Sequence, residues 1–145
     1  MRQDPTDAWP SGAPQVGHTA EIIRLVTSRD IELFSELTGD FNPIHYDPAK
    51  AERTRFGEIV VQGGVTTGIL NAIVAERLPG PGTVFLETRL SFHAPVRPGD
   101  EITGRVTVTA VRKDKPITEL DATVHTGDGT RVLSGELVCD TMSLD

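Results

Sequence analysis

The segment from residue 63 to residue 78 constrains the fold more than any other part of the chain. Apolar residues cover nearly every face of the helix that it would form, and the turn Pro79-Gly80-Pro81-Gly82 ends it. A helix that is apolar all round is usually buried. Its polar interruptions and its length, below the roughly 20 residues that span a bilayer, argue against a membrane segment. The rest of the chain must therefore enclose this helix.

Four strands are predicted after that turn. Apolar and polar residues alternate over residues 84–92, 102–110, 120–124 and 133–139, the period of a strand with one buried face. Residues 97–100, 114–116 and 127–129 are rich in Gly, Pro and Asp and predict turns. The last two turns join neighbouring strands, so hairpins and an antiparallel sheet are expected.

The region before the apolar helix predicts a strand within residues 16–26 and then a helix to Thr38. Thr27 or Ser28 can cap that helix, and Asp30 lies in its favourable first turn. Gly39 stands where a helix often ends in a left-handed residue. A short helical turn is expected at residues 49–54. The whole is an α+β fold in two layers, one antiparallel sheet and one apolar helix.

Composition bounds the organisation and the partners. The 145 residues suggest a single domain, residues 16–145, preceded by a disordered or loosely packed arm, residues 1–15, without the layout of a secretory signal. The net charge of −7 excludes a basic nucleic-acid footprint, and phosphate groups would need a local basic cluster. The single cysteine, Cys139, is expected in the core, which fits a reducing, cytoplasmic setting.

Asp40 and His45 are the candidate catalytic pair. They lie five residues apart across Pro43, and a helix would turn them about 140° from each other. Pro43 disfavours that helix and lets both side chains converge. A carboxylate and an imidazole together can accept and donate protons near neutral pH. The alternative is a solvent-exposed loop in which Asp40 only bonds its own backbone.

The start of the apolar helix offers a second candidate. Backbone N–H groups at a helix start lack intrahelical partners, and Gly63 lets a carbonyl oxygen approach them. A thioester oxygen held there would be polarised, as in an oxyanion hole. The alternative is that Gly63 and Gly64 only permit tight packing.

Motifs for other chemistries do not occur. The sequence contains no nucleophile elbow, no nucleotide-binding glycine loop and no zinc-protease motif. The four histidines have no metal-ligand spacing, and of the three besides His45 only His93 is a candidate for lining a site. Neither a metal nor a cofactor is expected.

Four blocks in order resemble the MaoC-like, (R)-specific enoyl-CoA hydratase family. They are FSELTGDFNPIHYDP from Phe34, FGEIVVQGGVTTGIL from Phe56, LSFHAPVRPGDEI from Leu90 and AVRKDKPI from Ala110. The resemblance covers roughly residues 22–138. The chain is similar above all to the short members of the family, which have one hotdog domain. This resemblance implies a hotdog fold and at least a homodimer.

The resemblance also implies roles for individual residues. Asp40 and His45 would activate water, Asn42 would hold the loop or the water, and the Gly63 N–H would hold the thioester oxygen. Many members have His-Gly where this chain has Gln62-Gly63, and a bulkier residue at Gly64. Gln62 is expected to contribute a hydrogen bond near the substrate without titrating. Gly64 is expected to leave extra room for the acyl chain.

The implied activity is reversible hydration of a trans-2-enoyl-CoA to an (R)-3-hydroxyacyl-CoA. A rival activity is that of a dehydratase, which would use the same site on a thioester of acyl carrier protein. Like charges would slow the encounter of this acidic chain with an acidic carrier. A hotdog thioesterase and a non-catalytic acyl-thioester binding domain are two further candidates.

Overall fold

The protein consists of a five-stranded sheet and a small number of helices. The computed structural model describes residues 8–9 and 12–145. The described elements are β1 (Thr19–Leu25), α1 (Ser28–Thr38), a 3-10 turn η1 (Pro43–His45), α2 (Pro48–Glu52), α3 (Gly63–Glu76), β2 (Thr83–Phe92), β3 (Glu101–Val111), β4 (Ile117–Thr126) and β5 (Arg131–Thr141).

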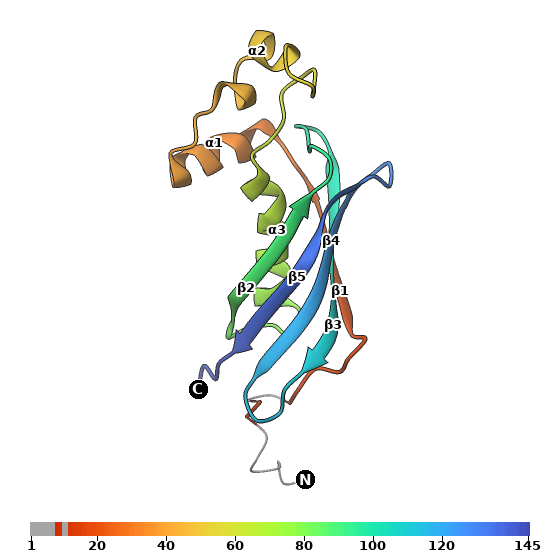
Figure 1. The fold of residues 1–145 in the computed structure, drawn as a ribbon. Helices are drawn as coiled ribbons and strands as arrows, with labels where there is room; N and C mark the ends of the chain where they lie inside the picture. Colours follow the sequence, from red (N-terminus) through yellow and green to blue (C-terminus); the bar gives the residue numbers. More distant parts are fainter. Residues whose placement is uncertain (1–7, 10–11) are drawn as a thin grey trace.

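The sheet is antiparallel throughout and has the strand order β1-β3-β4-β5-β2. Strands β3, β4 and β5 are joined by hairpins at the two predicted turns. Helix α3 lies along one face of the curved sheet and packs against β1, β2 and β3, while α1 and α2 lie at one end (Figure 1). This arrangement confirms the predicted α+β hotdog fold with an antiparallel sheet around one apolar helix.

The core forms between α3 and the inward face of the sheet. Ile69 and Ile73 of α3 are almost fully buried there. Gly104 of β3 lies beneath them, and a Cβ atom built on it would lie 2.8 Å from Cγ2 of Ile69. The helix therefore approaches the sheet closely because residue 104 has no side chain. Cys139 is also buried, as expected, and burial raises the pKa of its thiol to about 12.

Helix α1 has the predicted boundaries. The Asp30 carboxylate accepts a hydrogen bond from the Thr27 backbone N–H at 2.8 Å, and the helix ends at Gly39 with φ of 81°. Only glycine adopts this left-handed conformation at little cost. The chain consequently reverses at Gly39 and carries Asp40 back toward the start of α3.

Two expectations need correction. A loosely packed arm is wrong at Trp9, which is 2% exposed and donates a hydrogen bond to the Arg112 carbonyl at 2.6 Å; burial of the indole outweighs the polar composition around it. Residues 1–7 and 10–11 of that arm lie outside the described residues. In β2, the alternating residues Val84 and Leu86 face away from the core, because a bulge between Phe85 and Glu87 shifts the register.

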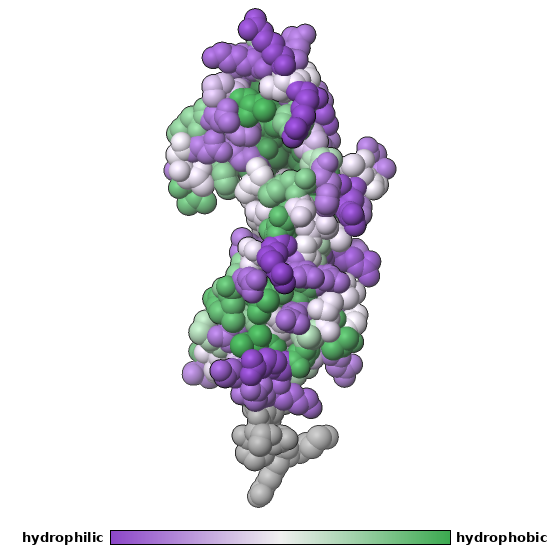
Figure 2. Space-filling view, in the orientation of Figure 1, coloured by the Kyte–Doolittle hydropathy of each residue, from purple (hydrophilic) through white to green (hydrophobic). Residues whose placement is uncertain are grey.

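Strand β2 forms one edge of the sheet and carries exposed apolar side chains on both faces. Val84 and Leu86 face away from the core, whereas Phe92 lies beside Gly63 at the inner face. Val84, Leu86 and Phe92 are between 44% and 58% exposed, and hydrophobic surface is visible in this part of the molecule (Figure 2). None of the helices in the described part of the chain is long and apolar enough to cross a membrane.

Candidate active site

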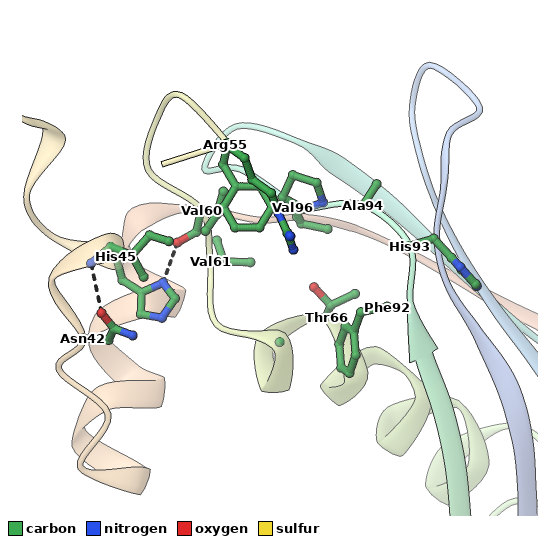
Figure 3. Close-up of a pocket in the computed structure, with 14 residues that line it drawn as sticks. Asn42, His45, Arg55, Val60, Val61, Thr66, Phe92, His93, Ala94 and Val96 are labelled. Carbon is green, nitrogen blue, oxygen red and sulfur yellow. Dashed lines mark hydrogen bonds between the residues drawn. The ribbon is translucent and has the colours of Figure 1, made fainter. Parts of the chain in front are cut away.

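A cavity of about 410 Å³ lies between the loop after α1 and the start of α3. Its walls come from four separate segments, since the loop, α3, the chain before α3 and the end of β2 all contribute (Figure 3). Most of the lining is apolar. The polar side chains in the lining are Asn42, His45, Arg55, Thr66 and His93.

Asp40 and His45 lie close together; His45 lines this cavity, whereas Asp40 is not among the lining residues. Oδ2 of Asp40 lies 3.8 Å from Nε2 of His45, and the side chains are 38% and 9% exposed. Nδ1 of His45 lies 2.7 Å from the Val60 carbonyl oxygen, which can only accept (Figure 3). In the neutral ring the proton is therefore on Nδ1, and Nε2 presents its lone pair toward Asp40.

The loop between the two residues is built by local hydrogen bonds. The Asn42 side chain accepts from the Ile44 N–H at 3.3 Å and caps the turn η1, while Oδ1 of Asp40 accepts from the Asn42 N–H at 3.1 Å. Pro43 occupies the first position of this turn, where its missing N–H costs nothing. The expected proline-fixed bend is thus a 3-10 turn, and it aims His45 back at Asp40.

Gly63 lines the same cavity and is the first residue of α3. The preceding Gln62 has no side-chain capping hydrogen bond to the helix, and the first N–H groups of a helix have no intrahelical acceptor. A Cβ atom on Gly63 would lie 3.0 Å from the Phe92 ring. Glycine therefore keeps the helix start both open to the cavity and in contact with β2.

Gln62 and Gly64, two predicted substrate contacts, are not among the residues that line this cavity. Gln62 is 2% exposed, and its amide is directed at α1. The extra room expected at Gly64 is filled, because a Cβ atom there would lie 2.1 Å from the Phe34 ring. Phe34 and Gly64 are thirty positions apart, so only the packing of α1 on α3 reveals this contact.

Thr66, Phe92 and Arg55 are among the lining residues that were not predicted from the sequence. Thr66 lies three positions after Gly63, so helical periodicity places it on the same face of α3. Phe92 lines the cavity from the end of β2, and Arg55 approaches it from the chain after α2. Arg55 also stacks over Phe56 at 5.0 Å from the ring centre. Nothing in the local sequence around Phe92 or Arg55 signals a site.

His93, a candidate lining residue from the sequence, does line the cavity. Its Nε2 lies 2.7 Å from Oγ of Ser134, and its ring points away from His45 (Figure 3). Among the residues that the structure describes, no group of three His, Cys, Asp or Glu side chains is arranged to hold a metal ion.

Comparisons with known proteins agree with this architecture. The (R)-specific enoyl-CoA hydratase of Aeromonas caviae is 38% identical over 124 residues, which are 86% of this chain and 92% of that protein. A solved structure of the A. caviae (R)-hydratase superposes with a TM-score of 0.84 and 36% identity, covering 89% of this chain and 98% of that one.

A second relative is the 3-hydroxybutyryl-CoA dehydratase of Methylorubrum extorquens. It is 39% identical over 122 residues, 84% of this chain and 77% of that protein. A family model described as the MaoC like domain matches residues 12–129. The chain, with its hotdog fold and the Asp40-to-His45 loop, belongs to the MaoC-like family.

Proposed function

We propose that the protein catalyses the reversible hydration of trans-2-enoyl-CoA to (R)-3-hydroxyacyl-CoA, with Asp40 and His45 activating one water molecule. The observation that carries the proposal is the facing pair at 3.8 Å, with His45 and Gly63 lining one largely apolar cavity. The names and the similarity of the relatives support the same activity.

The geometry suits a shared water molecule. The carboxylate of Asp40 and the imidazole of His45 are 3.8 Å apart, so one water molecule can form a hydrogen bond of about 2.8 Å to each of them. Either Asp40 or His45 accepts a proton from the water, and the water oxygen forms a bond to C3 of the enoyl chain. The electron pair of the C2–C3 double bond moves toward the thioester, and C2 receives the proton that the water lost. Addition on one face of the double bond gives the syn product.

Gly63 stabilises the charge that this addition creates. The electron pair is shared with the thioester oxygen in an enolate-like transition state. A backbone N–H at the start of α3 can donate to that oxygen, and the positive end of the helix dipole favours the charge. Asn42 holds the loop that carries the pair, through its hydrogen bond to Ile44. Neither Gln62 nor Gly64 needs to touch substrate in this arrangement.

The acyl carrier is CoA in this proposal. The chain has a net charge of −7, and an acidic carrier protein would meet it with like-charge repulsion. Arg55 lies in the cavity lining and forms no salt bridge within the part of the chain that the structure describes. It provides a local positive charge for the phosphate groups of CoA. A reducing, cytoplasmic compartment belongs to the same proposal, since Cys139 is a free buried thiol.

The working form of the enzyme is a homodimer joined at a sheet edge. Strand β2 ends the sheet on one side, with Val84, Leu86 and Phe92 exposed. An unpaired edge strand with exposed apolar side chains favours pairing with another strand. Because Phe92 also lines the cavity, a second copy joined there would border the site. Light scattering at micromolar concentration tests this, and a fully active monomer would contradict it.

A panel of trans-2-enoyl-CoA substrates of increasing length tests the activity. We expect loss of the conjugated-thioester absorbance without release of free thiol, and chiral analysis should give the (R) alcohol. Release of CoA thiol would identify a thioesterase instead. Binding without any absorbance change would identify a binding domain, and turnover of carrier-protein thioesters alone would identify a carrier-protein dehydratase.

A further inference from the structure

A buried polar connection links α1 to the start of α3. Gln62 and Ser35 are 2% and 1% exposed. Nε2 of Gln62 lies 3.1 Å from the Ile31 carbonyl oxygen and 3.1 Å from Oγ of Ser35. Reversing the amide would set its oxygen against the Ile31 carbonyl, so the nitrogen must occupy this position. Oε1 of Gln62 has no hydrogen-bond partner among the described residues, so the amide acts here as a donor.

The Ser35 hydroxyl also forms a hydrogen bond to the loop that carries Asp40 and His45. Its oxygen lies 2.6 Å from the Asp40 carbonyl oxygen, which can only accept. The Ser35 hydroxyl therefore donates its single proton to the Asp40 carbonyl oxygen, and it accepts a hydrogen bond from the Gln62 amide. The Tyr46 hydroxyl also contacts Ser35. Every hydrogen-bonding site of Ser35 is thus used, and the direction of the chain from Gln62 through Ser35 to Asp40 is fixed.

This connection joins the two halves of the site. Gln62 immediately precedes Gly63, whose N–H is the proposed oxyanion donor, and Asp40 carries the carboxylate that faces His45. We propose that Gln62 and Ser35 are positioning residues, which hold the Asp40 loop at a fixed place relative to the start of α3 without touching substrate. This inference rests on the proposed hydratase function.

The physical consequence is an effect on turnover rather than on binding. Water activation at the loop and charge stabilisation at Gly63 act together only in the transition state, so a small displacement between them lowers kcat. The apolar walls that hold the acyl chain come from other segments, for instance Val96 and Phe92. Their position does not depend on the Ser35 hydroxyl, and KM should change little.

The test uses full-length Ser35→Ala, Gln62→Met and the double variant. Methionine preserves the volume and the unbranched shape of Gln62 while removing both N–H donors. The matched control is Thr141→Val, since the hydroxyls of Thr83 and Thr141 form a buried pair at 2.9 Å between the neighbouring strands β2 and β5. Turnover, KM and the thermal midpoint are measured for each protein with the same enoyl-CoA.

We expect each single variant to lower kcat about tenfold, the effect of losing one modest hydrogen bond, with KM within about threefold of wild type. The double variant should lose little more than either single one, because both act through the Asp40 carbonyl. The control should lose thermal stability and keep its turnover. If Ser35→Ala does not fold, Gln62→Met tests the same connection from its other end.

Near-wild-type kcat in the folded Ser35 and Gln62 variants would overturn the positioning role, as would a tenfold loss that lies in KM alone. A loss of kcat in the Thr141→Val control equal to theirs would show a general effect of stability and would also overturn it. A wild-type protein without hydratase activity would refute the proposed function, and this inference with it. The two failures are therefore distinguishable.

Discussion

The start of α3 and the rest of the helix lie in different chemical surroundings. At the start of α3, the preceding residue Gln62 makes a buried polar contact: its amide donates to the Ser35 hydroxyl, which in turn bonds the Asp40 carbonyl. The remainder of the helix meets apolar side chains of the sheet and the bare backbone of Gly104. In the proposed mechanism the polar contacts at the start of α3 position the reacting groups, whereas apolar contacts along the rest of the helix supply most of the stability. Activity and stability should therefore respond to different substitutions.

The largest expected effect is on kcat, and it comes from the loop beside the start of α3. Asp40→Asn and His45→Gln should each lower kcat about 10²- to 10⁴-fold, because each removes a group that exchanges protons with water. Asp40→Asn should hardly move the thermal midpoint, since the Asp40 side chain is 38% exposed. His45→Gln should lower it modestly, because the ring is 9% exposed and bonded to the Val60 carbonyl. Enoyl-CoA turnover and circular dichroism measure the two quantities. Folded variants of both residues with near-wild-type turnover would show that the pair is not catalytic.

The second prediction sharpens the role of the helix start. Gly63→Pro removes the N–H, and proline is well tolerated at the first position of a helix. It should lower kcat about 10²- to 10³-fold, the usual cost of one lost oxyanion donor.

Gly63→Ala is the matched control, because its Cβ atom meets the same Phe92 ring at 3.0 Å while the N–H remains. Its loss should be clearly smaller. Equal losses in the two variants would indicate crowding against Phe92 rather than a missing donor, and circular dichroism checks that both remain folded.

The third prediction concerns the body of α3. Gly104→Ala should lower the free energy of unfolding by about 1–3 kcal/mol, because a methyl group there overlaps Ile69 at 2.8 Å in a packed core. Gly68→Ala makes the same chemical change within α3, at a position where a Cβ atom meets nothing within 4 Å. It should raise stability by about 0.5–1 kcal/mol. Chemical denaturation measures both, and changes of the same sign would contradict this account of the packing.

The smallest effect on activity is expected from chemical modification of Cys139, which lies in the apolar core. Burial raises its thiol pKa to about 12, so the folded protein keeps the unreactive protonated form at about pH 8. A chromogenic disulfide reagent should react slowly with the folded protein and with one thiol per chain after denaturation. Rapid reaction without denaturant would show that this part of the core opens readily. Activity should be unchanged until the core opens.

Much of the site was predictable because its signals are local. Gly39 ends α1, and Pro43 shapes the loop so that Asp40 and His45 meet. These rules involve residues within a few positions of each other. The four strands after α3 and the hairpins that join β3, β4 and β5 were similarly accessible from alternation and turns, but the pairing of β2 with β5 was not predicted. The catalytic use of these residues stays a prediction until turnover is measured.

The sequence by itself determined most of the elements, the caps of α1 and the approach of Asp40 to His45, because each depends on neighbours along the chain. Only the tertiary structure decided that Gln62 points at α1 rather than at substrate, and that Phe34 fills the space beside Gly64. Gln62 lies 27 and 31 positions from its two partners, Ser35 and Ile31. Contacts over such separations depend on how α1 crosses α3. That crossing is set by the packing of the α1 side chains against α3, which no local pattern records.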